Sequence, residues 1–210
     1  MPSSLYHLKV ADKITVMHPF LYTSSFFLGA IAPDSVNLHG FASKEVRWAA
    51  HRRARSLEEW TDNIAAFYSE NKGKVPGDFL TGYVVHVLTD IEADRMEPSI
   101  HERILNLKPD ADKYAEYSEE IRKAEDAELG KDWWLYARNK MGNSKATDIN
   151  GIKAEEILLW RDYVLKSYAS RTEGKAGVIT EEDFDAVASA VDKVLLDKGI
   201  CREAKECSCS

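Results

Sequence analysis

The segment from Gly82 to Asp90, GYVVHVLTD, constrains the fold most, because it places a histidine and an aspartate in a largely apolar run. Apolar residues around it recur with helical spacing, at Leu80, Tyr83, Val84, Val87, Leu88 and Ile91. This pattern predicts a helix over about 79–94, with His86 and Asp90 at the edge of its core-facing stripe. Residues four apart share one helix face. The pair can therefore offer a nitrogen and an oxygen to one metal ion.

Helical periodicity recurs along the rest of the chain, and no segment alternates apolar and polar residues for long enough to predict a strand. Ser56–Glu59 and Thr180–Asp183 read as helix-capping boxes, and glycine or proline residues interrupt the apolar pattern. We therefore expect an all-α fold. The predicted helices span 5–16, 20–31, 57–72, 79–94, 99–107, 110–141 with a break at Gly130, 151–170 and 181–198.

Length and composition favour one domain over residues 1–200, since 210 residues with 44% hydrophobic side chains can bury one sizeable core. No leader-like pattern opens the sequence, and no apolar run reaches the length of a membrane span, so we expect a cytoplasmic protein. The net charge of −7 disfavours binding to long nucleic acids. It does not disfavour a small anionic substrate bound at a local site.

All three cysteines, Cys201, Cys207 and Cys209, fall within residues 201–210. That segment is polar and lacks a periodic apolar pattern, which predicts a flexible tail with reduced thiols. A Cys-x-Cys metal clip is the alternative.

Four segments, taken in order, resemble the zinc-dependent phospholipase C family and its compact bacterial members. They are HLKVADKI at 7–14, FLGAIAPD at 27–34, Lys44 through His51, and GYVVHVLTD at 82–90. The superfamily, which includes single-strand-specific nucleases, is all-α and binds zinc ions between its helices. The resemblance covers about residues 3–95, and the remainder is similar only in being helical.

Carried over position by position, the resemblance implies five metal ligands: His7, Asp34, His51, His86 and Asp90. It makes Asp90 a bridge between two ions, and Asp34 and Asp90 the catalytic carboxylates. Three neutral imidazoles and two carboxylates around two Zn²⁺ leave a formal charge of about +2, which suits a phosphate group. The resemblance implies zinc as the cofactor, as two ions, with other divalent metals also possible. The expected substrate is a small phosphoester or phosphodiester.

Each of these residues also has a structural interpretation. His7 could be a core histidine at a helix contact, and Asp34 a helix N-cap after Pro33. His51 could be exposed among Arg47, Arg52, Arg53 and Arg55, which would form a solvated basic face or orient an anion. A simple hydrogen bond could satisfy His86 and Asp90.

The sequence departs from the larger family members in two respects. They build a third zinc site from downstream histidines, whereas only His101 lies downstream of Asp90 here. We therefore expect that site to be missing or rebuilt from carboxylates such as Asp94. The larger enzymes are also exported, and their processed N-terminal residue supplies a ligand, so the role of this N-terminus is open.

Three hypotheses for function follow. The first is a cytoplasmic dinuclear metallohydrolase of a small phosphate ester. The second is a non-catalytic metal-binding helical protein or interaction module. The third is a metal-free helical scaffold in which His86 and Asp90 are satisfied core residues. Oligomeric state is left open by the sequence.

Overall fold

The computed structural model describes residues 3–202, and these residues form helices and no β-strand, which confirms the all-α fold. The longer helices alternate with short helical turns near the N-terminus. In chain order the elements are α1 (Ser4–Met17), η1 (Pro19–Leu21), α2 (Ser24–Gly29), η2 (Ala32–Asn37), α3 (Lys44–Ala50), α4 (Leu57–Asn71), α5 (Gly77–Leu107), α6 (Lys113–Asp126), α7 (Asp132–Gly142), α8 (Ala154–Ala169) and α9 (Glu181–Asp197).

Both predicted caps stand at helix starts. The Ser56 hydroxyl accepts a hydrogen bond from the Glu59 amide and opens α4. At the start of α9 the Asp183 carboxylate accepts a hydrogen bond from the Thr180 amide. The predicted break near Gly130 is also present, because α6 ends at Asp126 and α7 begins at Asp132.

The single helix predicted over 20–31 is wrong. The chain is extended at Thr23, whose side chain accepts a hydrogen bond from the Phe26 amide and starts the short helix α2. Pro33 does not end the structure either, since it lies in the first turn of the 3₁₀ helix η2, where a missing amide proton costs nothing. The apolar run over 20–31 is therefore divided between η1 and α2, and η2 follows it.

The separate helices predicted over 79–94 and 99–107 are one helix, α5, which continues through Pro98. Ile100 and Ile104 beyond the proline are buried, and α6 packs against α5. This packing outweighs the hydrogen bond that proline removes. Helix α3 was not predicted as a helix.

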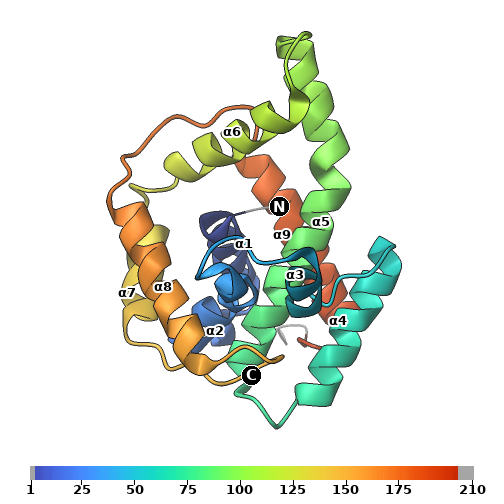
Figure 1. The fold of residues 1–210 in the computed structure, drawn as a ribbon, viewed down its shortest axis with the longest axis vertical. Coiled ribbons are helices and arrows are strands. Elements are labelled where there is room, and N and C mark those ends of the chain that lie inside the picture. The colour runs from blue at the N-terminus through green and yellow to red at the C-terminus, as the bar shows by residue number, and fades with distance from the viewer. Residues whose placement is uncertain (1–2, 203–210) are drawn as a thin grey trace, which may run out of the picture.

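Helix α5 organises the core, since it contacts α1, α2, α4, α6, α9 and η2. In Figure 1 the short N-terminal elements lie in the middle of the molecule, between α5 on one side and α7 and α8 on the other. One continuous hydrophobic core joins residues from all of these elements. The centre of α5 is consequently shielded from water, and this is where His86 and Asp90 lie.

Helices α2 and α5 approach each other closely because each has a glycine at the contact. A Cβ atom added to Gly82 would lie 3.0 Å from the Ala30 nitrogen and closer still to the Phe26 carbonyl oxygen. One added to Gly29 would meet the Phe79 carbonyl in the same way. The two glycines therefore set the distance between the backbones.

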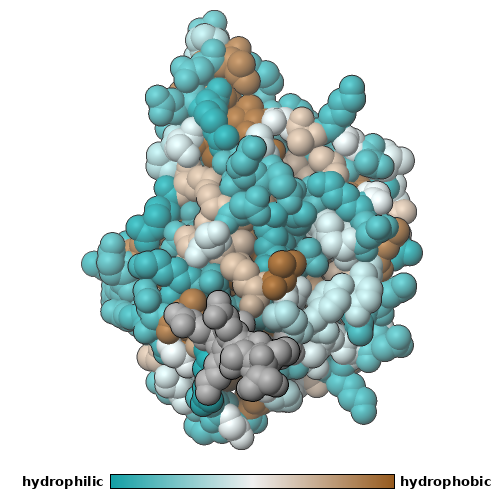
Figure 2. Space-filling model, turned by 180° about the vertical axis from the view of Figure 1, so that it is seen from behind, coloured by the Kyte–Doolittle hydropathy of each residue, from teal (hydrophilic) through white to brown (hydrophobic). Residues whose placement is uncertain are grey.

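The surface opposite the view of Figure 1 is largely hydrophilic, with hydrophobic residues scattered across it (Figure 2). Among residues 3–202, no helix combines the length and apolar character that a membrane crossing needs. The flexible tail predicted from residue 201 is wrong at Cys201, which is buried and hydrogen-bonded through its amide to the Leu195 carbonyl. Cys207 and Cys209 lie outside the described residues.

Candidate metal centre

The five predicted ligands converge on one buried location, although four separate chain segments carry them. His7 comes from α1, Asp34 from η2 and His51 from the residue that ends α3, while His86 and Asp90 come from α5. All five are buried, and Asp34 is the most accessible at 8%. The fold thus gathers side chains that are up to 83 positions apart in the sequence (from residue 7 to residue 90).

Their donor atoms form two overlapping groups of three. His7, His86 and Asp90 make up one group, and Asp34, His51 and His86 the other, with the atoms of each group within 4.8 Å of one another. The His51 and His86 Nε2 atoms are 3.2 Å apart, and His51 Nε2 lies 3.4 Å from an Asp34 oxygen. Ligand atoms around a tetrahedral zinc ion lie about 3.3 Å apart, given bonds of about 2.0–2.1 Å. The observed spacing fits a shared cation.

Asp90 turns its two carboxylate oxygens toward different histidines. Oδ1 is 3.5 Å from His7 Nε2, whereas Oδ2 is 3.5 Å from His51 Nε2 and 3.8 Å from His86 Nε2. The 3.8 Å separation is too long for the simple His86–Asp90 hydrogen bond that the sequence also allowed.

Two backbone carbonyls fix the tautomers of His51 and His86. His86 Nδ1 lies 2.8 Å from the Ala30 carbonyl oxygen, and His51 Nδ1 lies 2.9 Å from that of Arg47. A carbonyl oxygen only accepts, so each Nδ1 carries a proton and donates it. In the neutral rings both Nε2 lone pairs then point into the centre. Two lone pairs at 3.2 Å repel each other unless a proton or a cation lies between them.

Within residues 3–202, three buried polar atoms at the centre have no hydrogen-bond partner: His7 Nδ1 and both carboxylate oxygens of Asp90. A buried polar atom left unsatisfied costs about 1–3 kcal/mol, and a charged one costs more. The orphaned carboxylate fits a metal ligand, because a cation would satisfy both of its oxygens. A satisfied core carboxylate would accept hydrogen bonds from the protein instead.

Burial and neighbouring charge shift the pKa values of the three histidines in different directions. Burial lowers the pKa of His7 and of His86 well below the usual 6.5, so both are neutral and able to bind a metal at neutral pH. Burial also lowers the pKa of His51, but its hydrogen bond to Asp34 and the charges of Asp90 and Asp34 outweigh this and raise it to about 9.

The two carboxyl groups shift in opposite directions. Burial raises the pKa of Asp34, but the hydrogen bond and charge of His51 outweigh it, so the net pKa is lowered. For Asp90, burial dominates and raises the pKa. In the protein without metal, protonated His51 is therefore the cation between the two carboxyl groups. A divalent ion would replace that proton.

The sequence did not reveal the hydrogen bonds that hold the backbone around the candidate ligands in place. The Asn150 amide donates to the Ala49 and Ala50 carbonyls and to the Tyr83 hydroxyl, and so ties the end of α3 to α5. The Trp60 indole donates to the His51 carbonyl at 2.7 Å. Asn150 has a positive φ of 51°, and its only sequence signal was an asparagine before a glycine.

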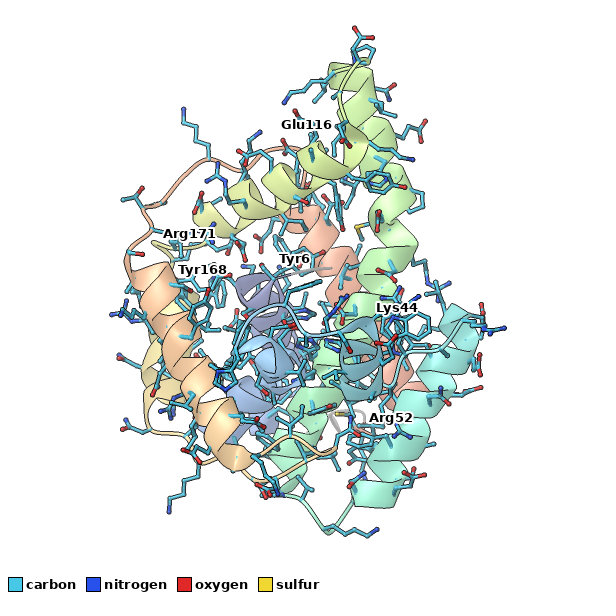
Figure 3. The ribbon with its side chains drawn as sticks, in the orientation of Figure 1. Tyr6, Lys44, Arg52, Glu116, Tyr168 and Arg171 are labelled. Carbon is cyan, nitrogen blue, oxygen red and sulfur yellow. The ribbon has the colours of Figure 1, made fainter. Side chains whose placement is uncertain are left out.

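The structural alternatives for Asp34 and His51 are wrong. Asp34 lies inside η2 and does not cap a helix, and His51 is buried. The predicted basic face is divided as well. The Arg53 guanidinium stacks over Trp60 and pairs with Asp94 at 2.6 Å, whereas that of Arg52 lies over Phe67. Figure 3 labels Arg52, just beyond the end of α3, well apart from Lys44 at the start of that helix.

Neither residue considered for a third metal site joins the centre. Asp94 is occupied by Arg53, and the His101 Nε2 atom lies 3.4 Å from Glu97, further along α5. The donor groups found within the described part of the chain contain neither residue.

No family model, curated protein or solved structure matches this chain. The relation to the zinc-dependent phospholipase C family therefore stays a prediction from four sequence segments. The convergence of the five side chains is a property of this structure and does not depend on that relation.

Proposed function

We propose that this protein is a phosphate-ester hydrolase that uses two divalent metal ions, preferably zinc, held by His7, Asp34, His51, His86 and Asp90. The convergence of these side chains, with both Asp90 oxygens buried and without a hydrogen-bond partner among residues 3–202, is the observation that carries the proposal. Mixed imidazole and carboxylate ligands are typical of zinc and related divalent ions.

The geometry supports Asp90 as the bridging ligand. His86 belongs to both donor groups, but its Nδ1 is hydrogen-bonded to Ala30, so it has one free nitrogen and can bind one ion. Asp90 has two oxygens that accept no hydrogen bond within residues 3–202, and they face His7 on one side and His51 on the other. A carboxylate in that position can serve both ions and offset their mutual repulsion.

The charge of the loaded centre suits a phosphate anion. Two divalent ions and two carboxylates sum to a formal charge of about +2, with the histidines neutral. When bound, such ions act as Lewis acids on a phosphoryl oxygen and activate water near neutral pH.

The protein side chains supply position and shielding. His7 and His86 are excluded from solvent and stack with ring centroids 3.6 Å apart, which fixes both rings. Asp34 is the ligand that borders a cavity of about 640 Å³. A substrate therefore reaches the centre past Asp34, and the substrate class expected is a small phosphate mono- or diester.

The proposal is tested by metal content and turnover on the same preparations. Wild-type protein purified without chelator should contain about two equivalents of divalent metal. It should hydrolyse bis-p-nitrophenyl phosphate, lose that activity in chelator and regain it with zinc. Asp90→Asn keeps the shape of the side chain but removes its charge. We expect it to retain at most one tightly bound ion and to lose activity by at least about a hundredfold.

Asp110→Asn is the matched control, because Asp110 is exposed in the α5–α6 connection and lies outside both donor groups. It should behave as wild type. Full metal content and full activity in Asp90→Asn would refute the dinuclear mechanism. Wild-type protein that binds metal but turns over no phosphate ester would instead identify the non-catalytic metal-binding protein. If no metal were bound even after reconstitution, the protein would be a metal-free helical scaffold.

A further inference from the structure

The cavity next to Asp34 has features that metal binding does not explain. It lies between η2, α3 and α8, and its volume of about 640 Å³ falls in the range of small-molecule sites, about 300–1,000 Å³. Asp34 is its only wall residue from the metal centre, and the remaining wall comes from other side chains. The cavity is therefore placed to hold the rest of a molecule whose phosphoryl group lies at the metals.

One wall carries a cation without an acidic partner. The Arg47 side chain borders the cavity, its Nε donates to the Ala42 carbonyl at 3.1 Å, and its guanidinium lies 4.0 Å from the centre of the Phe41 ring. Within residues 3–202 Arg47 forms no ion pair. The stacking on Phe41 and the bond to Ala42 hold the guanidinium in place, with its terminal nitrogens free to bind an anion.

The other cavity arginine is neutralised. Arg171 pairs with Glu125 and Asp126, each at 2.8 Å, and stacks over Tyr168. Figure 3 shows Tyr168 and Arg171 together near the end of α8, toward α6. Arg171 therefore shapes the wall, and Arg47 supplies the positive charge.

Helix α8 adds a stacked aromatic pair to the wall of the cavity. Trp160 and Tyr163 on α8 have ring centroids 5.2 Å apart and planes 24° apart, and Tyr163 is 57% exposed. Trp160 stacks on the tyrosine and both rings border the cavity, so a ligand there can contact the exposed ring surface of Tyr163. A flat ring gains from such a face through offset stacking as well as through burial.

We infer that this cavity binds phosphate esters that carry a flat aromatic group. The Arg47 guanidinium would bind the phosphate anion, and the Tyr163 ring would stack on the aromatic group of the ligand. The inference rests on the proposed function, since it assigns the substrate class of the same site. Arg47 is also a positioning residue, because its backbone carbonyl holds His51. A side-chain substitution at Arg47 leaves that carbonyl in place.

Binding of two non-hydrolysable probes, phenylphosphonate and methylphosphonate, tests the inference by calorimetry on the zinc-loaded full chain. Wild type should bind phenylphosphonate about fivefold more tightly than methylphosphonate, in line with one aromatic stack. Arg47→Gln should weaken both probes by about tenfold, as expected for a charge-assisted hydrogen bond. Tyr163→Ala should bring the two affinities together.

Two controls remove the same groups elsewhere. Arg55→Gln deletes an exposed arginine outside the cavity, and Tyr114→Ala deletes an exposed tyrosine that borders a different cavity. Both should bind the probes as wild type does. Zinc content and melting temperature, measured on each variant, establish that the centre is intact.

Equal affinities in Arg47→Gln and Arg55→Gln, or an unchanged preference in Tyr163→Ala, would overturn the inference. So would undetectable phenylphosphonate binding to wild type. Because these probes report binding alone, hydrolysis of bis-p-nitrophenyl phosphate together with such a result would leave the proposed function standing. Selective phenylphosphonate binding without hydrolysis would support the inference and count against the hydrolase.

Discussion

Replacing Gly82 by alanine should destabilise the protein and loosen the metal centre together. The new Cβ would lie 3.0 Å from the Ala30 nitrogen, whereas ordinary contacts begin near 3.4 Å. The Phe26 carbonyl is closer still, and both atoms belong to backbone that cannot rotate away. Helix α2 must therefore shift, and it carries along the Ala30 carbonyl that orients His86.

The magnitude follows from two opposing contributions. Overpacking of this kind costs about 1–3 kcal/mol, and a clash with backbone belongs at the upper end. Alanine in place of glycine in a helix returns about 1 kcal/mol. The net loss is about 2 kcal/mol, which lowers the melting temperature of a chain of this size by about 4–8 °C.

Thermal melts of Gly82→Ala and Gly77→Ala, with and without zinc, provide the assay. Gly77 begins the same helix, and an added Cβ there meets no atom within 4 Å, so its variant should stay within about 1 kcal/mol of wild type. Gly82→Ala should also bind zinc more weakly. A Gly82→Ala protein that melts with or above wild type and retains its metal would refute the close-packing explanation.

Two further outcomes are expected. Zinc at about a hundredfold excess over its Kd should stabilise wild type by about 2.7 kcal/mol, which raises the melting temperature by about 5–10 °C. His86→Ala should lose this shift, whereas His39→Ala should keep it, because His39 is exposed and lies outside both donor groups. Equal shifts in all three proteins would indicate adventitious binding. Burial raises the pKa of Glu181, but hydrogen bonds from Lys13 and Lys9 outweigh burial and lower this pKa to about 2. The charged carboxylate therefore stabilises the fold fully above pH 4.5, and this stabilisation is lost as the pH falls toward 2. Glu181→Gln should therefore melt below wild type at pH 7 and approach it at pH 3, and a gap that widens on acidification would contradict this sign.

The sequence by itself determined the fold class and the identity of the candidate ligands. Helical periodicity is a local property, so the apolar stripe around His86 and the caps at Ser56 and Thr180 could be read without a structure. The pair of His86 and Asp90 stood out because polar side chains in an apolar stripe need partners.

Helix boundaries were less predictable from the sequence where side-chain capping or tertiary packing overrides the local helical pattern. Thr23 interrupts an apolar run with a single side-chain hydrogen bond, and Pro98 leaves α5 continuous because the residues beyond it are buried against α6. Both outcomes depend on contacts that no local pattern records.

Only the tertiary structure decided how the ligands are held and which arginine faces the cavity. The tautomer of His86 depends on the Ala30 carbonyl, 56 positions away, and the end of α3 is tied down by Asn150, about 100 positions away. A backbone carbonyl has the same chemistry at every residue, so the sequence cannot say which one meets a given imidazole. Arg47 and Arg53 are likewise the same residue type in the sequence. They differ in the structure because Arg53 pairs with Asp94, whereas Arg47 forms no ion pair within residues 3–202.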